Sequence, residues 1–353
     1  MNIILRKMDK YFIGVMTGTS ADALDACVVS FNNQFQLIDK ASIDLEEFYK
    51  KEYEECLANG YKTTEESEKL LELENILNIK TVKLIEELLS KKHIDINKIY
   101  AIGFSGQTVF HTNDKSYQIG DPQKIADSLG IKVLSDFRNF DIAQGGLGAP
   151  LIPAFHKFLY SQEGKNKLIF NIGGIANGTY LNGQEISMGS DVGPGNCLMD
   201  LVASKKFNAP FDLNGEEASK GEININLFNK LISGCKNMKY PRADDKKDYY
   251  ELMDDSFLEI DSSSLMRTLA EFTAEKIKEF YDFCNKPEEI IFHGGGTMNI
   301  FLMELIKDKL GIEIKTTDNE IPSKFVEAAA FAYLAFLEKG EIYEPIRFEF
   351  EPK

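Results

Sequence analysis

The sequence lacks long apolar runs and has a deficit of positive charge. No run reaches the roughly 18 apolar residues that a transmembrane helix needs. The first residues, MNIILRKMDKYFIGV, lack the apolar core and cleavage site of a signal peptide. We therefore expect no membrane partner. The chain has 40 Lys and Arg against 56 Asp and Glu, a net charge of −16. Because binding to nucleic acid requires clustered positive charge, this balance also argues against a nucleic-acid partner.

Cysteine and histidine are also scarce. The 5 cysteines form no CxxC pair, and scattered thiols in odd number are typical of a reduced, cytoplasmic protein. The 4 histidines are too far apart in sequence to indicate a metal cluster. We interpret His111 and His156 as packed polar residues. None of these features excludes a small phosphorylated ligand, which needs only one local site.

The pattern of apolar segments predicts alternating strands and helices in both halves of the 353-residue chain. We expect an α/β protein with two domains. The first contains residues 1–131, the second contains residues 132–339, and the tail, residues 340–353, packs back on the first. The second half is predicted to contain a turn at Gly193, Pro194 and Gly195, followed by a helix over residues 196–207.

Three glycine turns each follow a predicted strand. They contain Gly18, Thr19 and Ser20; Gly173 and Gly174; and Gly294, Gly295 and Gly296. Glycine allows the backbone to approach a ligand closely, and successive N–H groups then bind an anion. No turn matches GxGxxG or GxxxxGK[ST], so neither a dinucleotide site nor a P-loop is supported. Any one turn alone is more simply a hairpin, but three of them suggest a nucleotide held between the domains.

Asp191 is the best candidate for a catalytic base. It lies among small residues in GSDVGPGN, where a substrate could reach it. Phosphoryl transfer uses a carboxylate to accept a proton or orient the nucleophile. A turn or helix-capping aspartate is the alternative. Arg138 could bind an anionic group of a ligand, and a structural salt bridge is its alternative.

Eight ordered motifs resemble the anhydro-N-acetylmuramic acid kinase family of the sugar-kinase/Hsp70/actin superfamily. The resemblance extends from the start of the chain to about residue 337. The motifs are IGVMTGTSADALDA, IGFSGQTVFH, QIGDPQKIA, SDFRNFDIAQGGLGAPLIPAFH, FNIGGIANGTYL, SDVGPGNCLMD, IFHGGGTMN and VEAAAFAYLAF.

The resemblance implies a two-domain fold with an interdomain cleft and a double reaction that uses ATP and Mg²⁺. The enzyme would open the 1,6-anhydro bridge of anhydro-N-acetylmuramic acid and phosphorylate O6. The product, N-acetylmuramic acid 6-phosphate, belongs to peptidoglycan recycling in the bacterial cytoplasm. The resemblance also implies a homodimer.

The same resemblance implies the site residues, with Asp191 as the base and Asp22 as a ligand of Mg²⁺. The implied ATP-binding residues are Gly18, Thr19, Ser20, Asp22, Asp25, Gly173, Gly174, Gly294, Gly295, Gly296 and Asn299. The implied substrate-binding residues are Ser105, Gln107, Thr108, Arg138, Asp141, Gly193, Asn196 and Glu327.

The chain departs from the family pattern mostly on the substrate side. Ala23 replaces a glycine, Ser105 replaces a histidine, and residues 241–245 read PRADD where a lysine-serine-threonine-glycine stretch is expected. An acidic residue near 324–327 and a closing threonine-glycine-alanine segment are also missing. We therefore expect altered substrate choice around Ser105 and residues 242–245. A kinase for another amino sugar and a non-catalytic nucleotide-binding scaffold are the alternatives.

Overall fold

The structure of the chain, a computed structural model, describes residues 10–32, 34–235, 239–253, 257 and 259–346. These residues form two compact units. Unit 1 contains the described residues up to Phe155 and those from Phe325 onward, and unit 2 contains His156–Lys324. The boundaries differ from the predicted ones, after residues 131 and 339, because the strand over Val133–Ser135 pairs within the sheet of unit 1 and the last helix packs on that sheet.

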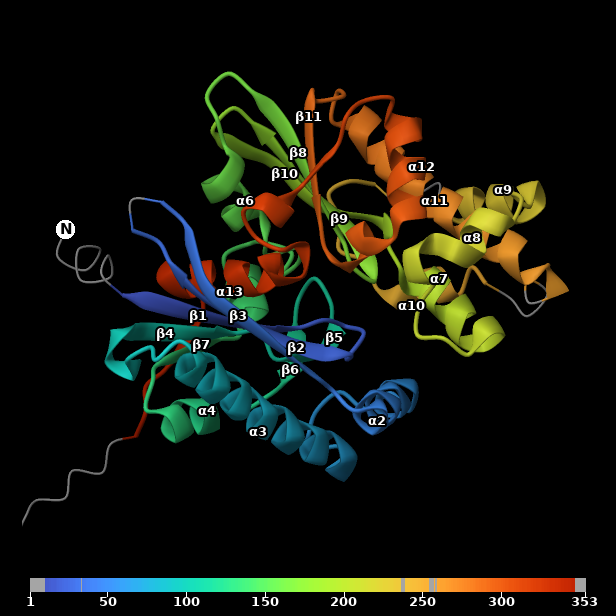
Figure 1. The fold of residues 1–353 in the computed structure, drawn as a ribbon. Coiled ribbons are helices and arrows are strands. Elements are labelled where there is room, and N and C mark those ends of the chain that lie inside the picture. The colour runs from blue at the N-terminus through green and yellow to red at the C-terminus, as the bar shows by residue number, and fades with distance from the viewer. Residues whose placement is uncertain (1–9, 33, 236–238, 254–256, 258, 347–353) are drawn as a thin grey trace, which may run out of the picture. The chain divides into compact units, whose positions relative to one another are not determined.

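Unit 1 is built on one sheet with the strand order β13-β7-β4-β1-β2-β3 (Figure 1). The strands are β1 (Tyr11–Thr17), β2 (Ala23–Ser30), β3 (Gln36–Asp44), β4 (Ile99–Phe104), β7 (Val133–Ser135) and β13 (Glu341–Tyr343). β1, β2 and β3 pair antiparallel, whereas β4 pairs parallel with β1 and with β7. A separate hairpin joins β5 (Gln107–His111) to β6 (Ser116–Ile119).

Of the helices of unit 1, the one over Pro122–Leu129 has clear local signals at both ends. The helices are α2 (Glu47–Ala58), α3 (Glu68–Lys91), α4 (Pro122–Leu129), α5 (Phe137–Ala143) and α13 (Val326–Phe336), with α6 (Pro153–Tyr160) at the boundary. In α4, the Asp121 side chain accepts from the amide of Lys124, Pro122 takes the first turn, and Gly130 ends the helix at φ 66°.

Helix α13 packs on the parallel strands of unit 1 because two facing glycines leave room for it. Gly14 of β1 and Gly103 of β4 are partners in the sheet. A Cβ at Gly14 would overlap the carbonyl oxygen of Ala328, and one at Gly103 would overlap that of Phe331. The helix thus approaches the strands at backbone distance. This contact between distant segments assigns the C-terminal helix to unit 1.

Unit 2 repeats this topology. Its sheet has the order β10-β9-β8-β11-β12. The strands are β8 (Asn166–Ile172), β9 (Ile175–Asn182), β10 (Glu185–Pro194), β11 (Glu289–His293) and β12 (Lys315–Thr316). The first three again pair antiparallel, and β11 pairs parallel with β8 and with β12. The predicted recurrence of strands and helices is therefore confirmed as a recurrence of topology.

The core of unit 2 lies on one face of its sheet, where α11 packs against β9 and β10 (Figure 1). The helices are α7 (Cys197–Val202), α8 (Glu216–Lys220), α9 (Ile225–Gly234), α10 (Lys246–Tyr250), α11 (Ser262–Phe283) and α12 (Ile300–Leu310). Alternate residues of β8 and β11 face the other side, where Ile169 and Ile291 pack with Tyr160 of α6.

The structure corrects one prediction near the candidate base. Gly193 and Pro194 do not form a turn but end strand β10. β10 is an edge strand, where proline is tolerated because no inner ladder bond is lost. Gly193 instead makes room for the side chain of Lys276 in α11. Asp191 therefore lies within a strand.

Two further features concern the cysteines and the character of the helices. All five cysteines are buried and free. Among the described residues, no helix combines the length and apolar character needed to cross a bilayer.

Candidate active site

The second glycine turn, which joins β8 to β9, is bonded to the chain that follows β10. The amides of Gly195 and Cys197 donate to the carbonyl of Gly174, at 3.0 and 3.1 Å. The amide of Asn196 donates to the carbonyl of Gly173 at 2.8 Å. A Cβ at Gly195 would overlap that same carbonyl oxygen. Glycine at this position therefore permits the close approach of the two segments.

The third glycine turn follows β11 and shares neighbours with the second. Gly294 has φ 92°, and a Cβ there would overlap Oδ1 of Asn171, at the end of β8. A Cβ at Gly296 would overlap Ile172 and lie 3.1 Å from Oδ1 of Asn196. Unit 2 thus brings together the second and third predicted turns.

Asn171 is a candidate ligand-binding residue that the sequence analysis missed. Its side chain is 3 % exposed, and within the described part of the chain its Oδ1 has no hydrogen-bond partner. Leaving a buried acceptor unpaired is costly, so the site suits an incoming donor or a hydrated cation. No other described atom lies within 4 Å of the Cβ position of Gly295, which leaves space beside the turn. The sequence did contain one signal for Asn171. It is a polar residue near the end of a mostly apolar strand, shortly before a Gly-Gly turn.

Asn171 belongs to a polar row that crosses the sheet of unit 2. Asp191 of β10 is opposite Asn177 of β9, Asn177 is opposite Asn171 of β8, and Asn171 is opposite His293 of β11. Opposite residues share one face of a sheet. Oδ1 of Asn177 and Nδ1 of His293 are also buried without a hydrogen-bond partner among the described residues. We name Asp191, Asn177, Asn171 and His293 the polar row.

Asp191 itself is 7 % exposed and is held by the segment that contains Arg242 and Asp244. Its Oδ2 accepts a hydrogen bond from the amide of Asp244 at 2.8 Å. Its own amide donates to the carbonyl of Arg242 at 2.9 Å. The helix-capping alternative is wrong, because the N-cap of α7 is Asn196 and Asp191 lies in β10.

His293 and His156 form a buried pair at one end of the polar row. Their Nε2 atoms are 2.9 Å apart, and Nδ1 of His156 is 2.8 Å from Oγ1 of Thr179. Burial lowers the pKa of His293 to about 3. Burial and the neighbouring His293 hold the pKa of His156 well below its usual range. Both rings are therefore neutral near pH 7, and His156 is a packed polar residue as predicted.

The first glycine turn, in unit 1, is held by side chains. The amide of Gln107 donates to the carbonyl of Gly18 at 3.0 Å, and its Oε1 accepts from the hydroxyl of Thr17 at 2.8 Å. Oγ of Ser105 accepts from the amide of Thr17 at 3.3 Å. Ser105 and Gln107, predicted to bind substrate, are thus the residues that position the turn. Thr19, at its tip, is exposed.

Asp22 does not offer a preformed metal site. Its carboxylate forms a 2.9 Å ion pair with Lys50 and its side chain is 56 % exposed. Asp25 is buried on β2. No cluster of three or more His, Cys, Asp or Glu suited to a metal occurs among the residues that the structure describes. Mg²⁺ in kinases needs only one or two carboxylates besides the phosphates. The Asp22 carboxylate meets that requirement in number, and its contact with Mg²⁺ stays a prediction.

Arg138 and Asp141, on α5, organise the glycine loop that follows them. Nη1 of Arg138 donates to the carbonyl of Gly148 at 3.1 Å, and Oδ2 of Asp141 accepts from the amide of Gly148 at 2.8 Å. A Cβ at Gly146 would overlap the carboxylate of Asp141. These contacts give both residues a structural role, and their predicted contact with substrate stays a prediction.

The remaining predicted residues have structural partners of their own. Asn299 caps α12, since its Oδ1 accepts from the amide of Leu302 at 3.0 Å. The carbonyl of Thr108 accepts from the hydroxyl of Tyr53. Glu327 lies in the first turn of α13.

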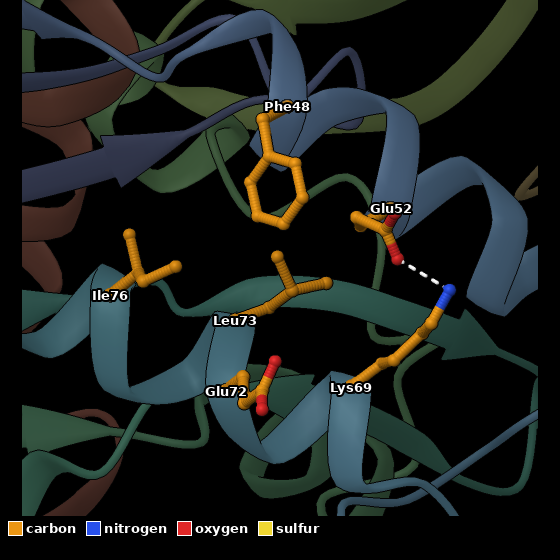
Figure 2. A pocket seen from close by; sticks show the side chains of 6 residues that line it. All are labelled: Phe48, Glu52, Lys69, Glu72, Leu73 and Ile76. Atoms are coloured by element: carbon orange, nitrogen blue, oxygen red, sulfur yellow. Dashed lines mark ion pairs between the residues drawn. The ribbon is translucent and has the colours of Figure 1, made fainter.

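A surface hollow of about 220 Å³ lies between α2 and α3, away from these residues (Figure 2). It is lined by Phe48, Glu52, Lys69, Glu72, Leu73 and Ile76. Lys69 and Glu52 form an ion pair of 2.6 Å at its edge. None of the predicted site residues contributes to it.

Comparison with known proteins decides the family. A family model described as anhydro-N-acetylmuramic acid kinase matches residues 10–342. The chain belongs to the anhydro-N-acetylmuramic acid kinase family. As a member of this kinase family it is a phosphotransferase, which confirms the predicted family and enzyme class.

Curated relatives agree along most of their length. A protein named anhydro-N-acetylmuramic acid kinase from Shewanella oneidensis is 36% identical over 338 residues, which cover 92% of this chain and 91% of the relative. One of the same name from Shewanella frigidimarina is 34% identical over 342 residues, with 92% and 91% covered.

Solved structures show the fold of this family member. Component A of the Acidaminococcus fermentans (R)-2-hydroxyglutaryl-CoA dehydratase has a TM-score of 0.52 at 11% identity, covering 94% of this chain and 99% of that one. The activator of the Clostridium difficile 2-hydroxyisocaproyl-CoA dehydratase, with bound ADPNP, has a TM-score of 0.51 at 12% identity, covering 93% and 95%. The predicted α/β fold of the sugar-kinase/Hsp70/actin type is confirmed.

Proposed function

We propose that the chain is an ATP-dependent kinase that opens the 1,6-anhydro bridge of anhydro-N-acetylmuramic acid and phosphorylates O6. The observation that carries this proposal is the position of Asp191 in the polar row beside two glycine turns. A buried carboxylate next to an unpaired amide oxygen is suited to receive a proton in a site shielded from bulk water.

In this proposal Asp191 takes a proton from a water molecule. The water oxygen bonds to the anomeric carbon as the bond from that carbon to O6 breaks. O6 bonds to the γ-phosphorus of ATP as the bond from that phosphorus to the ADP oxygen breaks. The products are N-acetylmuramic acid 6-phosphate and ADP, and the proton remains on Asp191 until solvent removes it.

We further propose that Gly173, Gly174, Gly294 and Gly295 approach the phosphates of ATP. The ADPNP complex of a protein with this fold supports a nucleotide site in the fold. The turn at Gly18, with the exposed Thr19, is a further candidate for phosphate binding. Mg²⁺ would arrive with the nucleotide and neutralise charge on its phosphates. Asn171 is the residue whose amide oxygen would face it or its water ligands.

We propose the cytoplasm as the compartment, peptidoglycan recycling as the role and a homodimer as the assembly. The five free buried cysteines support a reducing environment. Family membership supports the role in recycling and the homodimer. Light scattering behind size exclusion would test the dimer.

Release of ADP with anhydro-N-acetylmuramic acid tests the function, with N-acetylmuramic acid and N-acetylglucosamine as comparison substrates. Mass spectrometry should show a product heavier by one water and one phosphoryl group. Turnover only with another amino sugar would favour the diverged kinase, a reading supported by the contact of the altered residues Arg242 and Asp244 with Asp191. ATP binding without turnover on any sugar would favour a scaffold.

A further inference from the structure

The segment around Arg242, where the chain departs from its family motif, forms the outer wall of the Asp191 site. The segment lies along the edge strand β10. The amide of Arg242 donates to Oγ of Ser190 at 3.0 Å, its carbonyl accepts from Asp191, and the Asp244 amide donates to the Asp191 carboxylate. Three consecutive residues of the segment, 242–244, thus determine what faces the proposed base.

A buried ion pair holds this segment in place. Nε of Arg242 lies 2.9 and 3.0 Å from the two carboxylate oxygens of Asp244, and the side chains are 9% and 4% exposed. Nη2 of Arg242 also donates to the carbonyl of Val192 on β10, and the hydroxyl of Tyr249 donates to Asp244. The guanidinium lies 4.8 Å from the ring centre of Tyr240. Arg242 therefore connects the segment to the strand that carries Asp191.

The pairing also resolves a conflict of charge. Asp244 brings its own carboxylate to the neighbourhood of Asp191, and two neighbouring carboxylates disfavour each other's ionisation. Arg242 and Tyr249 bind the Asp244 carboxylate, while the Asp244 amide donates to Asp191. A hydrogen bond from an amide favours an ionised carboxylate and fixes its orientation.

We propose that Arg242 and Asp244 are positioning residues for Asp191. Their ion pair holds the backbone amide of Asp244 on the Asp191 carboxylate, which keeps that carboxylate ionised and aimed. This inference rests on the proposed function, since it assigns Asp191 as the base. The other titratable groups near this pair include Tyr240, Cys235, Tyr249 of α10, Lys276 with its partner Glu279 of α11, and His293 at the far end of the polar row.

The test compares Arg242→Gln and Asp244→Asn with a matched control, Arg267→Gln. Arg267 also forms a 2.9 Å ion pair, with Glu271, and also lies 4.9 Å from an aromatic ring, that of Phe301. It belongs to the same unit, on α11, but no contact with Asp191 is described for it. The control therefore measures what the loss of a comparable ion pair costs in stability alone.

We expect Arg242→Gln to lower kcat by about 10²-fold, as a misplaced catalytic group does, with KM for ATP changed by less than about 3-fold. The acid limb of the kcat profile should move to higher pH, because an ionised Asp191 is less favoured. Asp244→Asn, which removes the competing charge, should move it less. Arg267→Gln should leave kcat and the acid limb unchanged. An Arg242→Gln enzyme that loses only thermal stability would overturn the proposal.

A second measurement does not depend on turnover. The ¹³C carboxylate resonance of Asp191, assigned by its disappearance in Asp191→Asn, can be titrated in wild type, Arg242→Gln and Arg242→Lys. Titration at higher pH in Arg242→Gln, with partial recovery in Arg242→Lys, supports the positioning role even if every sugar fails as a substrate. An unchanged titration rejects it. Wild-type kcat in Asp191→Asn would instead reject the proposed base, so the two failures are distinguishable.

Discussion

The two units share a strand order but differ at the parallel pair in the middle of each sheet. In unit 1, Gly14 of β1 is opposite Gly103 of β4, and α13 fills the space above them. In unit 2, Asn171 of β8 is opposite His293 of β11, and both retain buried polar atoms without partners among the described residues. The same topology thus supports a closed helix contact in one unit and a polar row in the other.

The glycine turns of the two units differ in the groups that hold them in place. The Gly18 turn of unit 1 is held by the side chains of Ser105 and Gln107, whereas the Gly173-Gly174 turn of unit 2 is held by backbone amides. A substitution at position 105 or 107 removes a bond that supports the Gly18 turn, whereas the unit 2 turn is sensitive at Gly195, where a Cβ would overlap the Gly173 carbonyl oxygen.

The strongest test of the comparison is Asp191→Asn. This variant removes the proposed base of unit 2 and should keep the fold of the unit. We expect kcat to fall by about 10²–10⁴-fold, the usual cost of losing a general base. The fold should survive, because the amide oxygen of asparagine can still accept from Asp244. ADP release and thermal unfolding measure the two effects. A nearly normal kcat with a lowered Tm would instead assign Asp191 a purely structural role.

Acid should affect unit 2 more than unit 1. His156 and His293 have lowered pKa values in the folded protein, about 3 for His293, against 6.5 in an unfolded chain. The unfolded state therefore binds more protons below pH 6.5, so stability present at pH 7 is lost as the pH falls toward 3. His293 contributes about 1.4 kcal/mol per pH unit, or about 2 kcal/mol between pH 6.5 and 5, and His156 adds a loss in the same direction.

Hydrogen exchange of β8 and β11 against β1 and β4, at pH 7 and 5, measures this difference. The double variant His156→Gln and His293→Gln is the control, and its pH dependence in this range should be smaller by the contribution of two protons. Equal acid sensitivity in wild type and double variant would contradict the assignment.

Adding a methyl group at the glycine contact of unit 1 should have a smaller effect than these changes. It should still lower the free energy of unfolding more than the same change in a loop does. Gly14→Ala forces a methyl group against the carbonyl of Ala328, which is backbone and cannot rotate away. We expect a loss of about 3 kcal/mol in the free energy of unfolding. Gly60→Ala, at φ 78° with no described atom within 4 Å, should lose about 1 kcal/mol from backbone strain alone. Urea unfolding compares the two, and equal losses would argue against the close contact.

Ser105→Ala should have the smallest effect and tests whether side-chain support of the Gly18 turn matters. The variant loses the bond from the Thr17 amide, 3.3 Å, and the one to the Gly106 carbonyl, 2.9 Å. We expect a loss of stability of about 1 kcal/mol and a rise of less than tenfold in KM for ATP. An increase confined to KM for the sugar would support the prediction that position 105 contacts substrate.

The sequence is most informative where the signals are local. Asp121 and Pro122 mark the start of α4, Gly130 marks its end, and Asp261 marks the start of α11. Strand β10 was missed because Gly193 and Pro194 suggest a turn, although the edge of a sheet tolerates both. Nothing in the sequence near α13 showed that it packs on β1.

The residues of the candidate site also fall into those with a local sequence signal and those without one. The glycine turns and Asp191 are visible as motifs, since each needs a particular residue type at a particular place. Asn171 was missed because its importance comes from its partners across the sheet, Asn177 and His293, which are distant in sequence. The support that Gln107 gives to the Gly18 turn likewise depends on a contact between segments distant in sequence, and its contact with substrate stays a prediction.

The buried histidine pair determines which side-chain nitrogens and oxygens carry protons in this part of unit 2. Two neutral imidazoles that meet through their Nε2 atoms share one hydrogen, and each ring carries its second nitrogen in the opposite role. If His156 donates to His293, it must accept from the hydroxyl of Thr179, and Nδ1 of His293 carries a proton. If His293 donates, every one of these bonds reverses. The hydrogen bonds that link Thr179, His156 and His293 therefore all run in the same donor-to-acceptor direction. Reversing that direction requires all three side chains to change together.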